Sequence, residues 1–401
     1  MFFEIKKSSD STFSNSHNIV RDIWLNCDDG WKITDLGVAR IYSKGYVEHC
    51  AMDQQFFIEL INSPEPKFRG NFLAIIVNAD GEITITHDVH RGTPIAVSRN
   101  PWLITNLLRD STELVWADRY VKVNPVGLII DDLYFNPYGD FDFEPQSRQR
   151  VVQWLHRYID GKFQQFLSHN HEPIKVFLSG GIDTLCLFSF LKRHTDNFEI
   201  VNYEHVDFTK TYCNKKHLID QYWAYKQIHL WNNPTVLLTG ANGDENLLRS
   251  PGTINLLLMH YGLDIFDLIG PENYHYKYLT ADKLKPLYEK QRMDPDMWEL
   301  TQDYQKLCEQ ILNINLHDHQ HWHFDNTLTL TPFKDLELLK RMLKLPQEDQ
   351  IDQIMNAGIS KELLLMNDES LLEGLSNRKN QNTQENLYKI YEKYKNNTRT
   401  S

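Results

Sequence analysis

The chain has 401 residues, of which 41% are hydrophobic and 24% are charged, a balance typical of a folded protein long enough for two domains. Its 42 Lys and Arg residues against 54 Asp and Glu residues leave a net charge of -12, which argues against non-specific binding of nucleic acid. No stretch approaches the roughly 20 apolar residues that a membrane helix needs, and no signal peptide is evident. We therefore expect a cytoplasmic protein with no membrane association. The 5 cysteines form no CxxC pair, which favours reduced thiols over a disulfide framework or a zinc site.

Short β-rich runs and turn signals characterise residues 66–98. The run NFLAIIVNAD is followed by a predicted turn at Ala79, Asp80 and Gly81, and then by EITITHDV and PIAVS, which together predict an antiparallel sheet. The pattern continues through PWLITNLL and VNPVGLIIDDLYF. The next stretch is polar and poor in apolar anchors, and we place a domain boundary there, dividing residues 1–143 from residues 144–401.

The pattern of the second part of the chain predicts an α/β fold. Helical spacing of apolar residues predicts a helix over residues 146–169. Strands and helices then alternate, which predicts a parallel sheet with right-handed crossovers: IKVFL, TLCLFSFLKR, FEIVNYEHV, HLIDQYWAYKQIHL and PTVLLTG. After residue 250 the pattern is mostly helical and irregular. The expected fold class is thus α/β, with an antiparallel β-rich domain followed by a domain with a parallel sheet and a helical C-terminal part.

The segment Leu-Ser-Gly-Gly-Ile-Asp-Thr at residues 178–184 lies between the first predicted strand of this sheet and its helix. Gly180 and Gly181 allow a tight turn that brings backbone N–H groups to an anion, and the following helix directs its positive end to the same place. Ser179 and Thr184 add hydroxyl donors, and Asp183 offers a carboxylate to a magnesium ion that accompanies phosphates. The alternative is a plain strand-to-helix turn, but the residue order and the strand-helix context favour a phosphate loop.

This loop resembles that of the PP-loop ATP pyrophosphatases, whose motif is Ser-Gly-Gly-x-Asp-Ser. The later segment Thr-Gly-Ala-Asn-Gly-Asp-Glu at residues 239–245 is similar to a motif of class B asparagine synthetases, β-lactam synthetases and lasso-peptide cyclases. The resemblance implies that Gly240 approaches ATP and that Asp183 and Asp244 bind Mg²⁺, each following a strand of an open parallel sheet where ligands bind. Ala241 stands where asparagine synthetases have Glu and β-lactam synthetases have Tyr, so the acceptor chemistry is expected to differ from both.

Two further segments extend the resemblance toward the C-terminus. Thr-Pro-Phe-Lys-Asp at residues 331–335 is similar to the Pro-Phe-Leu-Asp segment of these synthetases. Lys361 and Lys379 correspond to the two lysine segments of the family, which implies that Lys361 contacts pyrophosphate and that Lys379 stabilises charge that develops during the reaction. The alternative is that both are solvated surface lysines.

Residues 66–98 also resemble part of the glutaminase domain of the same family, an Ntn-hydrolase-like fold, with Asp88, Gly92 and Pro94 in corresponding places. Such glutaminases use an N-terminal cysteine that removal of the initiator methionine exposes, whereas residue 2 here is Phe2. We therefore expect a degenerate amidotransferase-like domain that does not hydrolyse glutamine.

The resemblance as a whole implies an ATP-dependent, AMP-forming ligase that adenylates a carboxylate and transfers the acyl group to an amine or ammonia. The small-molecule or peptide substrates are left open. A rival hypothesis is a nucleotide-binding relative that has lost turnover and acts as a scaffold. An alternating run of histidines places four imidazoles on one face of a strand, for which metal binding and polar packing are both open: His317, His319, His321 and His323.

Overall fold

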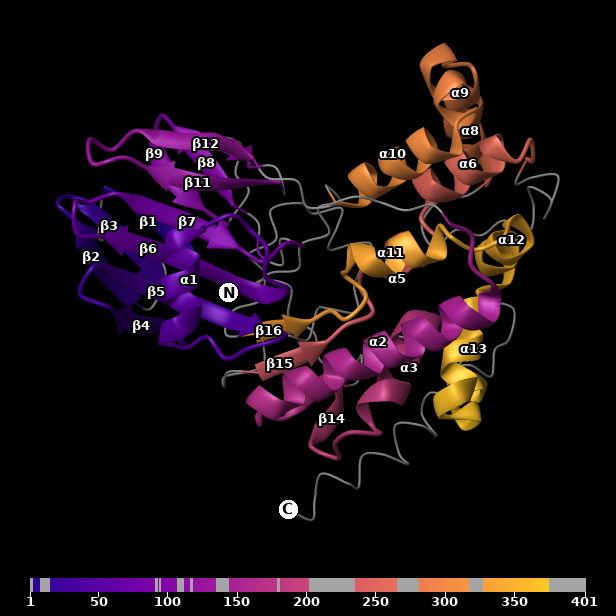
Figure 1. Ribbon diagram of the computed structural model, residues 1–401, viewed down its shortest axis with the longest axis horizontal. Coiled ribbons are helices and arrows are strands. Elements are labelled where there is room, and N and C mark those ends of the chain that lie inside the picture. The colour runs from indigo at the N-terminus through magenta and orange to yellow at the C-terminus, as the bar shows by residue number, and fades with distance from the viewer. Residues whose placement is uncertain are drawn as a thin grey trace.

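The protein is described here from a computed structural model, which places residues 3–7, 15–90, 93, 95–106, 112–115, 118–134, 144–178, 181–201, 235–264, 281–316 and 327–374. It is a mixed α/β structure in which two antiparallel sheets come first in the chain and a parallel sheet with helices follows (Figure 1). The α/β class expected from the sequence, with antiparallel sheets and a parallel sheet plus helices, is confirmed.

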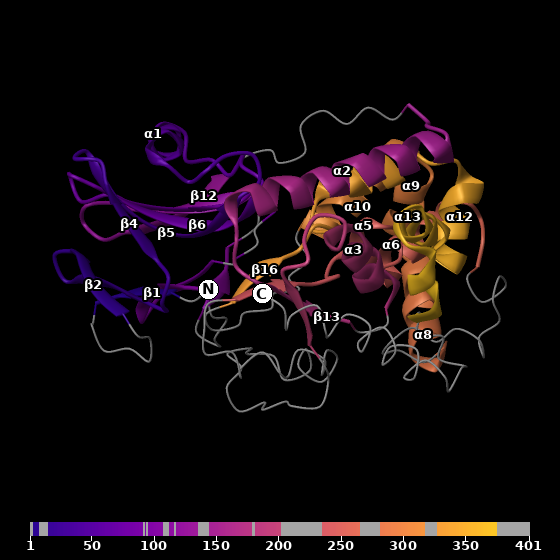
Figure 2. The ribbon, with the colours of Figure 1, turned by 90° about the horizontal axis from the view of Figure 1, so that it is seen from below.

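Two six-stranded antiparallel sheets make up the N-terminal β region, which covers the described residues up to Tyr134. The first sheet has the order β10-β8-β9-β1-β3-β2 and the second has the order β12-β11-β7-β6-β5-β4. Figure 2 shows the two sheets as stacked layers. The strands are β1 (Phe3–Lys6), β2 (Asn15–Val20), β3 (Ile23–Cys27), β4 (Lys32–Asp35), β5 (Ala39–Val47), β6 (Gly70–Asn78), β7 (Ile83–His87), β8 (Ala96–Arg99), β9 (Trp102–Thr105), β10 (Glu113–Leu114), β11 (Arg119–Val123) and β12 (Ile129–Tyr134).

Strand β6 is apolar at almost every position because both of its faces are covered. Leu73 and Ile75 point into the core between the two sheets, whereas Phe72 and Ala74 pack under helix α1 (Gln54–Asn62) on the outer face. A strand that is covered on both faces needs no polar alternation. Helix α1 covers this outer face, as Figure 2 also shows.

The sequence prediction of a single sheet over residues 66–98 was wrong in one respect. Strands β6 and β7 pair in the second sheet, joined by the predicted turn at Gly81, whose φ of 90° suits glycine. Strand β8 instead pairs with β9 and β10 in the first sheet. The sequence predicted the strands correctly but not their partners. Which sheet a strand joins depends on long-range packing that local sequence patterns do not encode.

The C-terminal α/β region begins with α2 (Arg148–His169), a helix close to the predicted range of 146–169. Its sheet has the order β14-β13-β15-β16 and every pairing is parallel. The strands are β13 (Ile174–Phe177), β14 (Phe198–Val201), β15 (Thr235–Leu238) and β16 (Thr327–Leu330). The first three were predicted and β16 was not. The predicted helix HLIDQYWAYKQIHL lies outside the described residues.

This strand order creates a switch point in the sheet. From β13 the chain goes to β14 on one side, and later returns to β15 on the other side of β13. Ligands of open parallel sheets bind in the crevice that such a reversal leaves at the carboxyl ends of the two strands. Helix α3 (Ile182–Leu191) follows β13 and the short α5 (Gly243–Asn246) follows β15. Both begin at this edge.

The remaining described helices lie beside the parallel sheet and extend away from the N-terminal β region (Figure 1). They are α6 (Pro251–His260), α8 (Ala281–Arg292), α9 (Pro295–Thr301), α10 (Tyr304–Leu316), α11 (Leu336–Met342), α12 (Gln347–Asn356), α13 (Gly358–Asn367) and the 3-10 helix η3 (Glu369–Gly374). Among the described residues, no helix combines the length and the apolar character that crossing a membrane requires.

Candidate functional site

The candidate site lies where the chain leaves β13 and β15. Helix α3 starts after Gly181, which is its N-cap, and places Asp183 in its first turn, where a carboxylate is favoured by the helix dipole. Every residue from Thr184 to Leu191 is buried, which is why α3 is apolar all round. The position of Asp183 is therefore set by a helix that is packed on all sides.

Two glycines bring the second segment against the first. A Cβ atom on Gly240 would lie 2.8 Å from the amide nitrogen of Thr184, and one on Gly243 would lie 2.8 Å from the Asp183 Cβ. Real Cβ atoms do not approach other heavy atoms this closely, so both positions require glycine or a shift of the backbone. The close approach brings together the predicted residues Gly181, Asp183, Thr184, Gly240 and Asp244.

Arg249 joins the two carboxylates. Its Nη2 atom donates a hydrogen bond to Asp183 Oδ1, and the same nitrogen lies 3.1 Å from Asp244 Oδ1. The side chain of Arg249 is only 14% exposed and that of Asp183 is 16% exposed. Two carboxylates from the first turns of two different helices thus converge on one cationic atom. Sequence reasoning missed Arg249, which belongs to no periodic pattern.

The backbone before Arg249 has an unusual conformation. Leu248 has a φ of 62°, a left-handed value that costs a non-glycine residue about 1–2 kcal/mol. Its side chain is fully buried, and the backbone N–H of Arg249 donates to the carbonyl of Asp244 at 2.6 Å. Burial of Leu248 and this hydrogen bond hold the turn that returns Arg249 to the two aspartates.

Two buried asparagines lie on the same segment. Asn242, the N-cap of α5, has a φ of 62°, and Asn246 donates through Nδ2 to the carbonyl of Phe333 at 2.6 Å. The Oδ1 atoms of Asn242 and Asn246 have no hydrogen-bond partner within the described part of the chain. The bond to Phe333 brings the Thr-Pro-Phe-Lys-Asp segment beside α5, so a third motif of the resemblance reaches the site.

Lys361 is exposed on helix α13, and its positive charge helps to lower the pKa of Asp352 on helix α12. Its neighbour Ser360 is buried and receives a hydrogen bond of 3.1 Å from the amide of Gln353, which also donates to the carbonyl of Leu247 at 2.9 Å. Gln353 therefore connects the start of α13 to the turn that carries Arg249. The predicted residues Ser179, Gly180 and Lys379, and the four-histidine run, lie outside the described residues.

Asp335 takes part in a different cluster from the other motif residues. Lys162 on α2 lies 2.7 Å from Asp335 Oδ2 and 2.7 Å from Glu48 Oε1, and all three side chains are buried. The Tyr158 hydroxyl also donates to Asp335, and His90 Nε2 lies 3.3 Å from it. Glu48 and His90 belong to the N-terminal β region, so this buried ionic cluster connects that region to the C-terminal one.

Burial and charge act in opposite directions within the cluster. Burial opposes ionisation of Asp335, but the positive charge of Lys162, with His90 and Arg69, holds the pKa of this carboxyl well below its ordinary value. Burial likewise disfavours a charged Lys162, yet Asp335 and Glu48 raise its pKa above the ordinary value. Asp335 and Lys162 are therefore both charged in the folded protein, and each charge offsets the cost of burying the other. Its interior position suggests structure rather than catalysis.

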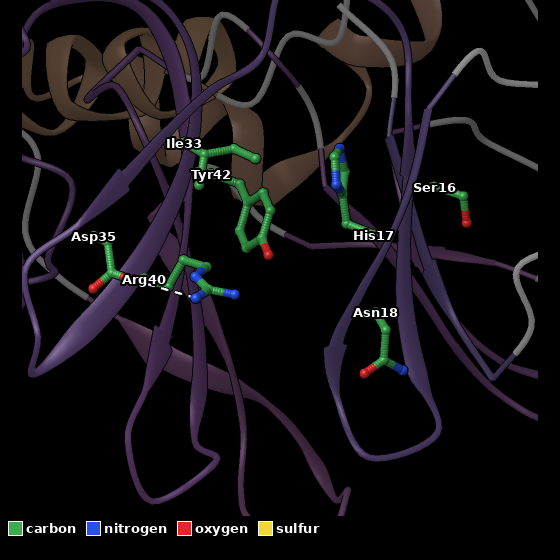
Figure 3. Close-up of a pocket in the computed structure, with 7 residues that line it drawn as sticks. All are labelled: Ser16, His17, Asn18, Ile33, Asp35, Arg40 and Tyr42. Atoms are coloured by element: carbon green, nitrogen blue, oxygen red, sulfur yellow. Dashed lines mark hydrogen bonds and ion pairs between the residues drawn. The ribbon is translucent and has the colours of Figure 1, made fainter.

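An open hollow of about 480 Å³ lies in the N-terminal β region, between β2 and the strands β4 and β5 (Figure 3). Its lining residues are Ser16, His17, Asn18, Ile33, Asp35, Arg40 and Tyr42. Arg40 and Asp35 pair at 3.2 Å across its rim, and both are more than half exposed. Among the described residues, no predicted site residue lines this hollow, and its charges balance, so we assign the candidate site to the edge of the parallel sheet.

The donor atoms of the candidate site determine whether it can hold a metal ion. Within the described residues no group of three or more His, Cys, Asp or Glu side chains converges as a metal site. Asp183 and Asp244 do supply two carboxylate oxygens to one point, as Mg²⁺ requires when nucleotide phosphates and water complete its octahedron.

No protein-family model matches the chain, and no curated protein matches it either.

Proposed function

We propose that this chain is an ATP-dependent, AMP-forming amide ligase related to the asparagine synthetases, β-lactam synthetases and lasso-peptide cyclases. One observation carries the proposal. Asp183 and Asp244, from the first turns of the helices that follow adjacent parallel strands at the switch point of the sheet, meet at a single cationic nitrogen. Paired carboxylates beside a helix start and two closely packed glycines form a suitable environment for Mg²⁺ and nucleotide phosphates.

The proposed roles follow the chain. Mg²⁺ bound by Asp183 and Asp244 would neutralise phosphate charge. The phosphate cradle would consist of backbone and hydroxyl donors in the loop after β13, with Gly240 next to the nucleotide: Ser179, Gly180, Gly181 and Thr184. Lys361 and Lys379 would neutralise charge on the departing pyrophosphate and on the acyl transfer step.

The reaction needs two displacements. An oxygen of the substrate carboxylate attacks the α-phosphorus of ATP, and the bond to pyrophosphate breaks. The nitrogen of an amine or of ammonia then attacks the acyl carbon, loses a proton, and AMP leaves with the electron pair of the broken bond. Neither Gly240 nor Ala241 supplies a functional side chain, so binding of the amine would depend on other residues of the site.

The N-terminal β region would be an Ntn-hydrolase-like domain without glutaminase activity. Its two stacked antiparallel sheets are compatible with that fold class. Burial raises the pKa of the Cys27 thiol to about 12, and burial also raises the pKa of Cys50. Because the thiolate is the nucleophile, neither cysteine is suited to attack glutamine. Ammonia or an amine would therefore come from solution.

A nucleotide-binding scaffold is the second candidate function, and two observations favour it. Ala241 has no polar side-chain atom at the position where related synthetases carry Glu or Tyr. Arg249 partly neutralises the two carboxylates that would hold the metal. Such a protein would bind ATP at the same place without turning it over.

Exchange of labelled pyrophosphate into ATP distinguishes the two functions. The full-length protein is incubated with Mg-ATP, labelled pyrophosphate and a panel of amino acids, peptides and other carboxylates. A ligase incorporates label into ATP only with its own carboxylate, and Asp183→Asn abolishes the exchange. Asp264→Asn is the matched control, because Asp264 pairs with Arg292 away from the site. ATP binding without exchange across the panel would support the scaffold.

A further inference from the structure

The cation in the candidate site belongs to the protein itself. Arg249 Nη2 contacts Asp183 and Asp244 together, so one guanidinium nitrogen sits at the point where both carboxylates converge. The Arg249 and Asp183 side chains are largely buried, which reduces the screening of their charges by water. A divalent cation that uses both carboxylates must enter this same space.

The backbone of Arg249 is anchored on both sides of the residue, whereas its guanidinium lies at the end of a long side chain. Leu248 is fully buried in a left-handed conformation, and the amide of Gln353 holds the carbonyl of Leu247 at 2.9 Å. The N–H of Arg249 is bound to the carbonyl of Asp244 at 2.6 Å. The guanidinium is connected to this anchored point by a flexible side chain, so it can leave the carboxylates without unfolding the turn.

We propose that Arg249 is a built-in competitor of the metal ion. In the nucleotide-free protein its guanidinium occupies the pair Asp183 and Asp244 and excludes free Mg²⁺. When a nucleotide binds, its phosphates attract the guanidinium, which forms bidentate hydrogen bonds with phosphate oxygens, and the vacated carboxylates accept the Mg²⁺ that accompanies the nucleotide. The metal therefore enters only together with the nucleotide. This second step rests on the proposed function, whereas the exclusion of free metal does not.

Mn²⁺ serves as the probe, because its electron paramagnetic resonance signal separates free ion from protein-bound ion. The full-length protein, Arg249→Gln and Arg292→Gln are each titrated with Mn²⁺ in the absence of nucleotide. Arg292 is the matched control, since it pairs with an aspartate of its own, Asp264, at 2.5 Å. We expect the Arg249→Gln variant to bind Mn²⁺ tighter than the wild type by on the order of 10-fold or more, because two facing carboxylates lose their cation. The control variant should behave as the wild type.

The double variant Arg249→Gln with Asp183→Asn tests where the gained site lies, and it should lose the added Mn²⁺ affinity. Equal Mn²⁺ binding by wild type and Arg249→Gln would overturn the proposal. If Arg249→Gln does not fold, as judged by circular dichroism, the wild type alone decides. Tight Mn²⁺ binding by the wild type without nucleotide then refutes the proposal, and binding that appears only after ATP is added supports it.

The two hypotheses fail in different ways. If ATP does not bind but Arg249→Gln gains a metal site, the competition is correct and the proposed function is wrong. If ATP binds but the variant gains nothing, the proposed function stands and the competition is wrong.

Discussion

Replacing Gly243 with alanine is a sharp test of the close contact between the two loops. The new methyl group would lie 2.8 Å from both the Cβ and the Oδ1 of Asp183. Asp183 cannot retreat along α3, because the residues after it in that helix are all buried. Either the carboxylate rotates out of place or α5 shifts, and overpacking of this kind costs about 1–3 kcal/mol. We expect the free energy of unfolding to fall by about 2 kcal/mol and the affinity for Mg-ATP to fall on the order of 10-fold.

Gly252 provides the matched control. It lies in the first turn of α6, and a Cβ there would have no heavy atom within 4 Å. Gly252→Ala should leave nucleotide binding unchanged and stabilise the protein by about 0.4–1 kcal/mol, since alanine suits a helix better than glycine. Urea denaturation and calorimetric titration with Mg-ATP measure both quantities. The reasoning is refuted if Gly243→Ala is as stable as Gly252→Ala and binds nucleotide equally well.

Three further predictions concern the ionic cluster and the lysines. Lys162→Met leaves the buried carboxylates of Glu48 and Asp335 without their shared cation and should destabilise the protein by about 3–5 kcal/mol in urea, an effect that Glu48→Gln in the same chain should partly relieve. Because the folded pKa of Asp335 lies below its ordinary value of 3.8, its stabilising contribution is fully present above about pH 5 and is lost as the pH falls toward the folded pKa. The stability difference between wild type and Asp335→Asn should therefore shrink on acidification, and a constant difference would contradict the assignment. Lys379→Ala should lower the catalytic rate on the order of 100-fold with little change in ATP affinity, whereas Lys361→Ala should also raise the ATP dissociation constant. Full activity of Lys379→Ala would contradict the role that the C-terminal resemblance implies for this lysine.

Elements with a strong local signal could be predicted from the sequence. Strand β13 and helix α3 were visible because an apolar run, a pair of glycines and a second apolar run follow one another. Strand β16 was missed because Thr-Leu-Thr-Leu alternates threonine and leucine and has no continuous apolar run, and it is a strand by virtue of its pairing with β15. The assignment of β8 to the other sheet was likewise beyond local patterns.

The candidate site, too, could be predicted from local sequence only in part. The aspartates followed from their motifs, but Arg249 reaches them through the left-handed turn at Leu248, a conformation that no rule for leucine predicts. The burial of Lys162 between Glu48 and Asp335 depends on two distant parts of the chain, so no local pattern of helix α2 indicates it. Long-range charge pairing of this kind becomes visible only in the fold.

We propose that Asp183 and Asp244 form a Mg-nucleotide site at the switch point of the parallel sheet. Equilibrium binding of ATP to the full-length protein, with and without Mg²⁺, tests it most directly. We expect Mg²⁺-dependent binding that Asp244→Asn weakens on the order of 10-fold or more and that Asp264→Asn leaves unchanged. Failure of the wild type to bind Mg-ATP, or equal binding by Asp244→Asn, would contradict it.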